Sequence, residues 1–310
     1  MSNILITGVA GFLGRTLARH YFEQGWDVIG TDIVAPENAP ASFLKKYLPA
    51  YLPSPAFVQL LKDTKPSICI HCAGRASVGA SILRPFEDYI QGPELTFYVL
   101  NCLHEALPVC KFVLLSSAAV YGNTLVLPIE ENTMPAPISI YGFNKWQSEI
   151  ICREFFEVYQ QPTASVRIFS AYGPGLRRQV IWDICEKAIS GDTINLLGTG
   201  NESRDFIYSL DIAAGVEAVA KSAGMSGEIY NLASGRQITI SYLANLVLDY
   251  LQLGKKEILF DAIEPFGNPL NWQADIQKIT QLGFSPAIPF EKGLHAYITW
   301  FLSECGRGLI

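Results

Sequence analysis

The chain has 310 residues, 49% of them hydrophobic and 17% charged, with a formal net charge of −6 at pH 7. This composition excludes a disordered chain and predicts a sizeable core, while the acidic balance argues against a general nucleic-acid binder, which needs a basic face. No apolar run approaches the roughly 20 residues of a membrane helix, and the first residues lack the basic region of a signal peptide. We therefore expect a cytoplasmic protein that binds neither nucleic acid nor membrane.

The first elements predict one βαβ unit. Residues 4–6 are an apolar strand, residues 12–24 an amphipathic helix that ends at Gly25, and residues 26–32 a second strand.

The same alternation continues along the chain. We predict helices over 57–63, 86–106 and 139–159, strands over 67–72, 111–116 and 164–169, a break at Gly92-Pro93 and a loop over 34–55. This alternation predicts the α/β class, with a Rossmann-like doubly wound parallel sheet. Shorter elements follow Pro174, where we expect a smaller C-terminal substrate domain. Residues 1–170 would form the Rossmann domain and 171–310 mainly the substrate domain, with a return to the Rossmann domain near 205–235.

Seven cysteines are spread between Cys69 and Cys305. Several lie in apolar, strand-like runs, and we interpret them as reduced core residues rather than a disulfide framework. Cys69 and Cys72 form a C-x-x-C pair, but residues three apart on a strand face opposite ways. No second pair or histidine cluster accompanies them, so we predict no metal site.

Glycines recur at three-residue intervals between the first strand and the first helix, at Gly8, Gly11 and Gly14. In such a loop the first glycine permits a tight turn, the second lets the backbone approach a pyrophosphate, and the third lets helix and strand pack closely. Asp32 ends the second strand, where a carboxylate binds ribose hydroxyls and repels a 2′-phosphate. The pattern favours NAD over NADP; the alternative is a plain tight turn with Asp32 as a solvated strand end.

Tyr141 and Lys145 are four residues apart on a predicted helix and so share one face. A phenol has a pKa of about 10, and a nearby cation favours the phenolate, which can take a proton from a sugar hydroxyl. Ser117 follows a buried strand, at the end where open α/β sheets place their active sites. Each motif alone is common by chance, but their order after a matching cofactor loop predicts a catalytic triad.

Further motifs accompany these residues. They are HCAG at 71–74, SSAAVYG at 116–122, AYGPG at 171–175, RDFIY at 204–208, YNLASG at 230–235 and LGFSP at 282–286. With the glycine loop and the triad they cover nearly the whole chain. The sequence resembles the extended short-chain dehydrogenase/reductase family, specifically its NAD-dependent epimerase/dehydratase branch, whose best-known member is UDP-glucose 4-epimerase.

The resemblance implies roles for individual residues. Ser117, rather than Ser116, would be catalytic with Tyr141 and Lys145, because it directly precedes Ala-Ala-Val-Tyr-Gly. The residues expected to hold NAD are Gly8, Gly11, Phe12, Leu13, Gly14, Asp32, Ala73, Tyr141, Lys145 and Tyr172.

The resemblance also implies a nucleotide-diphosphate sugar as the substrate. Ser117 would bind the sugar, and Arg204 would contact the diphosphate, because a guanidinium fork matches phosphate oxygens. Arg177 and its neighbour Arg178 are further candidates, and their alternative is a pair of solvated charges at a helix start.

The sequence departs from the family pattern at several positions. Related 4,6-dehydratases carry Asp-Glu where this chain has Ala118 and Ala119, which argues against dehydration. A second phosphate-binding arginine, common in relatives, is replaced within the PFGN of 265–268. The helix asparagine common in the family is replaced by Gly92.

These features lead to a nucleotide-sugar 4-epimerase that acts through a transient 4-keto intermediate. The alternative is an NAD(P)H-dependent reductase of a nucleotide 4-keto-6-deoxysugar, which would use the same triad. A dinucleotide-binding sensor without chemistry is a third reading, and such relatives usually lack the tyrosine or the lysine. By the resemblance we also expect a homodimer, formed by the helices over 86–106 and 139–159.

Overall fold

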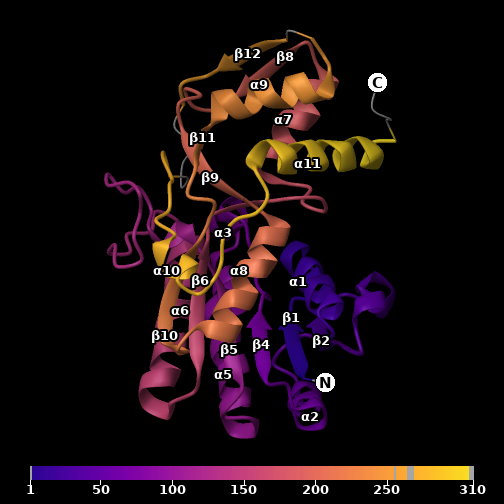
Figure 1. The fold of residues 1–310 in the computed structure, drawn as a ribbon, viewed down its shortest axis with the longest axis vertical. Helices are drawn as coiled ribbons and strands as arrows, with labels where there is room; N and C mark the ends of the chain where they lie inside the picture. Colours follow the sequence, from indigo (N-terminus) through magenta and orange to yellow (C-terminus); the bar gives the residue numbers. More distant parts are fainter. Residues whose placement is uncertain (1, 255, 264–268, 307–310) are drawn as a thin grey trace.

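A computed structural model describes residues 2–254, 256–263 and 269–306 of the chain (Figure 1). Its larger part is a seven-stranded parallel sheet with the order β10-β6-β5-β4-β1-β2-β3. The strands are β1 (Asn3–Thr7), β2 (Asp27–Asp32), β3 (Lys46–Pro49), β4 (Ile68–His71), β5 (Lys111–Ser117), β6 (Thr163–Ile168) and β10 (Ser226–Leu232). The strand order runs outward in both directions from β1, so the predicted Rossmann-like doubly wound sheet is confirmed.

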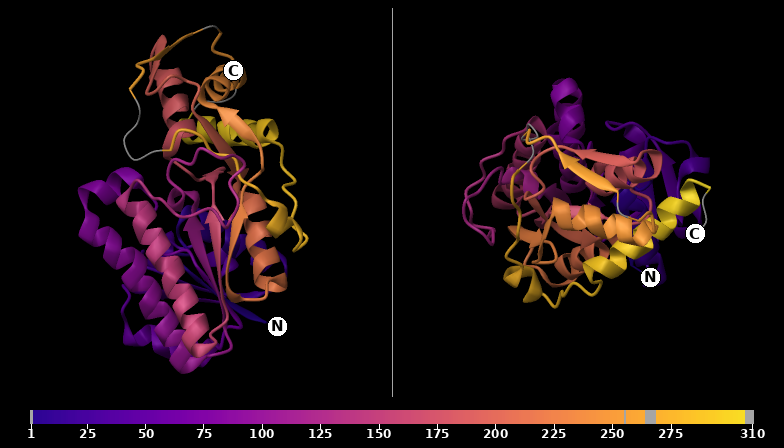
Figure 2. Two further views of the ribbon diagram at one scale, coloured as in Figure 1. Left: turned by 90° about the vertical axis from the view of Figure 1, so that its left-hand side faces the viewer. Right: turned by 90° about the horizontal axis from the view of Figure 1, so that it is seen from above.

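Helices cover both faces of this sheet (Figure 2). Ile4 and Ile6 of β1 share a core with α1 and α8, whereas Leu5 packs with α2, α5 and α6 on the other face. Since successive strand residues point to opposite faces, β1 is buried on both sides and its sequence is apolar throughout. The helices are α1 (Phe12–Glu23), α2 (Pro55–Thr64), α5 (Leu95–Ala106), α6 (Ile140–Tyr159) and α8 (Ser209–Ser222).

A second, smaller part lies above the carboxyl ends of the central strands in Figure 1. Strand β9 pairs in parallel with β7 and antiparallel with β11, while β8 and β12 form a separate parallel pair. The elements are β7 (Ser170–Tyr172), α7 (Gln179–Ser190), β8 (Thr193–Leu196), β9 (Ser203–Tyr208), β11 (Gln237–Thr239), α9 (Ile240–Leu251), β12 (Glu257–Phe260) and α11 (Phe290–Glu304). Between β9 and β11 the chain passes through α8 and β10, and β10 pairs with β6 in the large sheet. The division of the chain into two domains at residue 170 stays a prediction.

The loop predicted over 34–55 was wrong at Lys46–Pro49, which forms the edge strand β3. This strand has only four residues, none of them fully buried, and it pairs with β2 alone. An edge strand of this kind lacks the continuous apolar run that marks the central strands, so the sequence carried no signal for it. Two short 3-10 turns, Pro36–Asn38 and Ala41–Phe43, precede it.

The break predicted at Gly92-Pro93 is confirmed. Helix α4 (Pro85–Tyr89) leads into a π-helical turn, Ile90–Glu94, which leads into α5. Pro93 has no N–H and its ring clashes with a regular helical turn, and a wider turn accommodates it. The structure also contains the short helices α3 (Val78–Leu83) and α10 (Gln277–Thr280) and the 3-10 turn Ala118–Val120.

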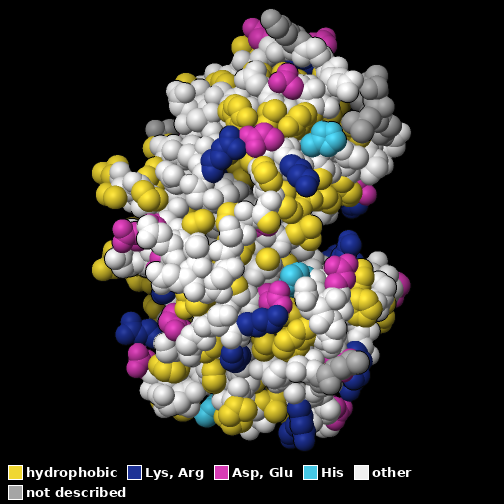
Figure 3. All heavy atoms as spheres, in the orientation of Figure 1, with side chains coloured by type: hydrophobic (Ala, Val, Ile, Leu, Met, Phe, Trp, Pro, Cys, Tyr) yellow, Lys and Arg dark blue, Asp and Glu magenta, His cyan; other side chains and the backbone are white. Residues whose placement is uncertain are grey.

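The cysteines, the possible metal ligands and the surface charges bear on the predictions made from the sequence. All seven cysteines are free thiols, and burial raises the pKa of Cys69 and Cys72, which makes their reactive thiolate forms unfavourable. No group of three or more His, Cys, Asp or Glu side chains in the described ranges is placed to hold a metal ion. Figure 3 shows positive and negative side chains interspersed over one face. Of the helices that the structure describes, none is long and apolar enough to cross a membrane.

Candidate active site

A cleft of about 630 Å³ lies where the carboxyl ends of the central strands meet the smaller part of the molecule. The glycine loop lines it on one side, and residues from β9 and the segment after β12 line it on the other. Ser117, Tyr141 and Lys145 all face this cleft. The structure therefore brings the predicted cofactor loop and the predicted triad together in one cavity.

The glycine loop has no room for side chains. Gly8 has a φ of +67°, and a Cβ there would lie 2.6 Å from the backbone nitrogen of Ala73. A Cβ on Gly14 would lie 2.1 Å from the Gly8 carbonyl oxygen, inside van der Waals contact. Helix α1 begins directly after Gly11 without a side-chain cap, so its first N–H groups are left for a ligand. The loop thus fits a dinucleotide pyrophosphate, and Phe12 and Leu13 line the same cleft.

Asp32 is fixed at the carboxyl end of β2, beside this loop. Its Oδ2 accepts a hydrogen bond from the Ala10 backbone N–H at 2.9 Å, and its Oδ1 accepts one from the Ile33 N–H at 2.7 Å. The carboxylate is therefore held in place next to the pyrophosphate cradle, which suits the ribose contact expected from the sequence.

Helix α6 supplies the tyrosine and the lysine. The Ser139 hydroxyl caps the helix by accepting a hydrogen bond from the Gly142 N–H at 3.1 Å. The Lys145 ammonium lies 5.9 Å from the centre of the Tyr141 ring and donates to the Leu115 carbonyl of β5 at 2.8 Å. The i, i+4 spacing thus places both side chains on the face of α6 that meets β5.

Ser117 is the last residue of β5, and its position depends on a glycine that the sequence analysis did not single out. Its hydroxyl accepts a hydrogen bond from the Ala119 N–H at 3.2 Å, which holds the turn after the strand. A Cβ on Gly142 would lie 2.5 Å from the Ala119 carbonyl oxygen. Glycine at this position lets α6 approach the turn that carries Ser117. This glycine stands within the Tyr-Gly-x-x-Lys sequence, but helix periodicity does not reveal that the helix and the turn approach closely there.

Arg204 of β9 is a largely buried cation in the cleft. Its Nη1 donates to the carbonyls of Ser203 at 2.8 Å and Leu270 at 3.1 Å, and its guanidinium lies 5.7 Å from the centre of the Trp272 ring. Burial lowers the pKa of Arg204 to about 10, partly offset by Glu202. Because no carboxylate of the described residues forms an ion pair with it, a negatively charged ligand would stabilise this cation. Trp272 belongs to no motif and was missed from the sequence.

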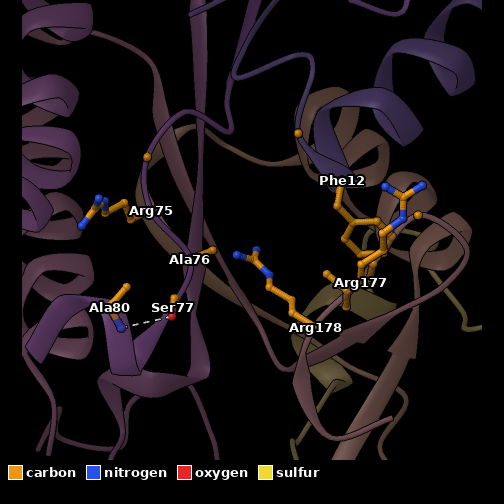
Figure 4. Close-up of a pocket in the computed structure, with 11 residues that line it drawn as sticks. Phe12, Arg75, Ala76, Ser77, Ala80, Arg177 and Arg178 are labelled. Atoms are coloured by element: carbon orange, nitrogen blue, oxygen red, sulfur yellow. Dashed lines mark hydrogen bonds between the residues drawn. The ribbon is translucent and has the colours of Figure 1, made fainter. Parts of the chain in front are cut away.

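Arg177 and Arg178 differ although they are adjacent. The Arg177 guanidinium donates to the carboxylate of Glu304 on α11. In Figure 4, Arg178 extends across a pocket toward Ala76, in the loop after β4, whereas Arg75 points away from it. Arg75 is paired with Glu87 at 2.7 Å. Both adjacent arginines line the pocket of Figure 4, but of the two only Arg178 also lines the cleft that contains Tyr141 and Lys145.

Two expected cofactor contacts lie beside the cleft. The Tyr172 side chain is buried in the core of the smaller part and donates to the Phe290 carbonyl at 3.2 Å, while its neighbours Ser170 and Ala171 line the cavity. Ala73 lies behind Gly8, and its N–H donates to the Thr7 hydroxyl at 3.3 Å. The PFGN of 265–268 lies outside the described residues.

The fold and the cleft are those of an enzyme that transfers hydride with a dinucleotide cofactor. The comparisons with known proteins make the family specific. The sequence model of the NAD dependent epimerase/dehydratase family matches residues 4–233, and the chain belongs to that family. It is therefore an NAD-dependent enzyme of the extended short-chain dehydrogenase/reductase type, with NAD as its cofactor.

The named relatives include both epimerases and dehydratases. The chain is 27% identical to an uncharacterized UDP-glucose epimerase of Bacillus subtilis, over 97% of this chain and 98% of the relative. It is also 27% identical to the dTDP-glucose 4,6-dehydratase 1 of Escherichia coli, over 97% and 93% of the two chains. The fold matches a UDP-glucose 4-epimerase of Thermotoga maritima with a TM-score of 0.89, at 24% identity and over 98% and 99% of the two chains.

His71, at the end of β4, gives a prediction about pH. It is 1% exposed, its Nδ1 is hydrogen-bonded to the Thr7 hydroxyl at 2.8 Å, and burial together with Lys145 lowers its pKa from 6.5 to about 3. Between these values the unfolded chain binds a proton that the folded chain does not. The free energy of unfolding should therefore fall by up to about 1.4 kcal/mol per pH unit as the pH drops below about 6.5.

His71→Asn keeps a polar atom for Thr7 and cannot titrate. Urea unfolding at a series of pH values should give a flatter curve for this variant than for the unchanged protein between pH 6.5 and about 3, the window between the two pKa values. Parallel curves would mean that His71 titrates alike in the folded and unfolded chains.

Proposed function

We propose that the protein is an NAD-dependent nucleotide-sugar 4-epimerase. Within the family, the epimerase is favoured over a dehydratase by the contacts that the carboxylates around the cleft make. Of the described residues that line it, only Asp183 and Glu202 are acidic. Asp183 pairs with Lys187 at 2.7 Å, and Glu202 accepts hydrogen bonds from the Thr199 and Gly200 N–H groups at 2.9 Å each. Glu202 is thus held by the backbone, and Asp183 lies on α7 rather than in the turn after Ser117, where related dehydratases carry their acidic pair.

The positions after Ser117 support the same choice. Ala118 and Ala119 are buried and have no proton to exchange. Dehydration of a sugar needs an acid to protonate the leaving hydroxyl and a base to take a second proton. Epimerisation needs a single group that removes the 4-hydroxyl proton and later returns it. Among the described residues that line the cleft, Tyr141 is the candidate for this group.

In the proposed reaction the Tyr141 oxygen takes the proton of the sugar 4-hydroxyl, and the same oxygen gives it back to the 4-keto intermediate after the sugar has turned over. Ser117 donates a hydrogen bond to the substrate oxygen and orients it. The Lys145 ammonium, held by the Leu115 carbonyl, places a positive charge 5.9 Å from the centre of the Tyr141 ring. Bound NAD supplies a reversible hydride acceptor, held by the glycine loop and Asp32.

A nucleotide sugar labelled with deuterium at C4 tests this function. We expect the product to be the 4-epimer with the label still at C4, because the same hydride returns to the other face. Tyr141→Phe should lower kcat by about 10² to 10⁴-fold, the usual contribution of general acid–base catalysis, with little change in KM. Loss of the label, together with steady consumption of NADH or NADPH by a 4-keto sugar, would instead establish the reductase.

Arg177, Arg178 and Arg204 should differ in how strongly they bind the substrate, because their surroundings differ. We propose that Arg204 and Arg178 hold the substrate diphosphate, and that Arg177 contributes less because Glu304 already binds it. A hydrogen bond to a charged group contributes about 1.5–3 kcal/mol, so Arg204→Ala and Arg178→Ala should each weaken nucleotide-sugar binding by about 10- to 100-fold. Arg177→Ala, the matched control, should change it little. Calorimetric titration with UDP-glucose measures all three, and equal effects of Arg177→Ala and Arg178→Ala would contradict the assignment.

We also propose a homodimer through α5 and α6, which lie side by side on one side of the molecule (Figure 2). Large apolar side chains on their outer faces are solvent-exposed, including Phe97 at 45% and Ile150 at 50%. Exposed apolar patches of this kind mark contact surfaces. Sedimentation velocity should find a dimer that Ile150→Glu converts to a monomer. Leu210→Glu, at a 48% exposed position on α8, which covers the other face of the sheet, should leave the dimer intact, and a monomeric unchanged protein would refute the proposal. A cytoplasmic location also stays a prediction, which cell fractionation would test.

A further inference from the structure

A fully buried ion pair lies directly behind the triad. Glu149 of α6 and Arg167 of β6 have side-chain exposures of 3% and 1%. Glu149 Oε1 accepts from Arg167 Nε at 2.9 Å, and Glu149 Oε2 accepts from Arg167 Nη2 at 2.7 Å. Apolar residues of similar volume often stabilise a core as well as a buried ion pair does. Stability alone therefore does not account for this pair.

The ion pair is connected to the catalytic strand. Glu149 is one helical turn beyond Lys145 on α6, and its Oε1 also accepts a hydrogen bond from the Ser116 hydroxyl at 2.5 Å. Lys145 donates to the Leu115 carbonyl at 2.8 Å. Two successive residues of β5 are thus bound by two successive turns of α6, immediately before Ser117. These two contacts join the end of β5 to the helix that carries the tyrosine.

The arginine holds the other side of the same turn. The Arg167 guanidinium lies 4.5 Å from the centre of the Tyr121 ring, in the turn after Ser117, and its Nη1 donates to the Glu131 carbonyl at 3.3 Å. The Tyr121 hydroxyl donates to Asn231 of β10 at 2.7 Å. The strand end and the turn after it are therefore held from two directions by one connected polar network.

We propose that Glu149 and Arg167 are positioning residues for the triad. By holding Ser116 from α6, Glu149 keeps Ser117 in register with Tyr141, and Arg167 fixes the Glu149 carboxylate in the orientation that accepts the Ser116 hydroxyl. Neither residue lines the cleft. Both act through Ser117 and Tyr141, so this inference rests on the proposed function for its kinetic readout.

Two double variants separate positioning from stability. Glu149→Leu/Arg167→Met and Glu149→Gln/Arg167→Met both remove the charges as a pair, so that no uncompensated ion is left in the core. Only the glutamine keeps an oxygen that accepts the Ser116 hydroxyl. We expect the leucine variant to lose about 10²-fold in kcat, the scale of a small misplacement of reacting groups, with KM little changed and a C4 deuterium isotope effect on kcat. The glutamine variant shares the loss of Arg167 and should also lose kcat, but about 10-fold less than the leucine variant, because it keeps the contact to Ser116.

Ser116→Ala and Ser148→Ala provide the matched pair of controls. Ser148 is also a buried serine, but it bonds to Thr96 of α5 at 3.3 Å and to the Asn144 carbonyl, away from β5. Ser116→Ala should lower kcat, and Ser148→Ala should not. Equal kcat in the two double variants, at equal melting temperatures, would overturn the proposal and leave the pair a structural feature.

Crystal structures of the two double variants test the positioning without a substrate. Ser117 should be displaced from α6 farther in the leucine variant than in the glutamine variant, and equal positions of Ser117 in the two variants would also overturn the proposal. A protein that epimerises no nucleotide sugar, but whose leucine variant displaces Ser117, would contradict the proposed function and leave the positioning intact.

Discussion

The active site depends on how closely helix α6 can approach the end of β5. A side chain at Gly142 would collide with the Ala119 carbonyl, so the absence of one lets α6 rest on the turn that follows Ser117. Tyr141 and Lys145 precede and follow this contact on the helix and are carried with it to the carboxyl edge of the sheet. The glycine loop after β1 reaches the same edge, because parallel strands end on one side. The glycine loop and Gly142, neither of which has room for a side chain, thus bring the cofactor site and the triad into one cleft.

Much of the fold could be predicted from the sequence, because the central strands are buried on both faces. Runs such as 4–6 and 111–116 are apolar throughout, and this pattern together with the intervening helices defines a parallel sheet. The edge strand β3 could not be found, since four half-exposed residues with one neighbouring strand carry no such pattern. The triad was predicted from spacing, but its supports were not. Periodicity says which face of a helix a residue occupies, whereas the contact of Glu149 with Ser116 depends on how helix and strand pack.

The residues on the substrate side of the cleft were the hardest to predict from the sequence. Arg204 lies in a motif, but the adjacent Arg177 and Arg178 could not be told apart until the structure placed one against Glu304 and the other across the pocket. The relatives include both a UDP-glucose epimerase and a dTDP-glucose dehydratase at the same 27% identity. Overall similarity therefore does not separate the two reactions. The alanines after Ser117, and the engaged carboxylates around the cleft, are the features of this chain that favour the epimerase.

An epimerase of this kind needs no external reductant, because the hydride that leaves the sugar returns to it. The most direct measurement is to denature the purified protein and to identify and quantify the dinucleotide that it releases. The account predicts NAD in near-stoichiometric amount, as expected for a cofactor that stays bound through each turnover. Release of little or no dinucleotide would contradict a resident hydride acceptor, and the cofactor would then exchange at every turnover, as in a reductase.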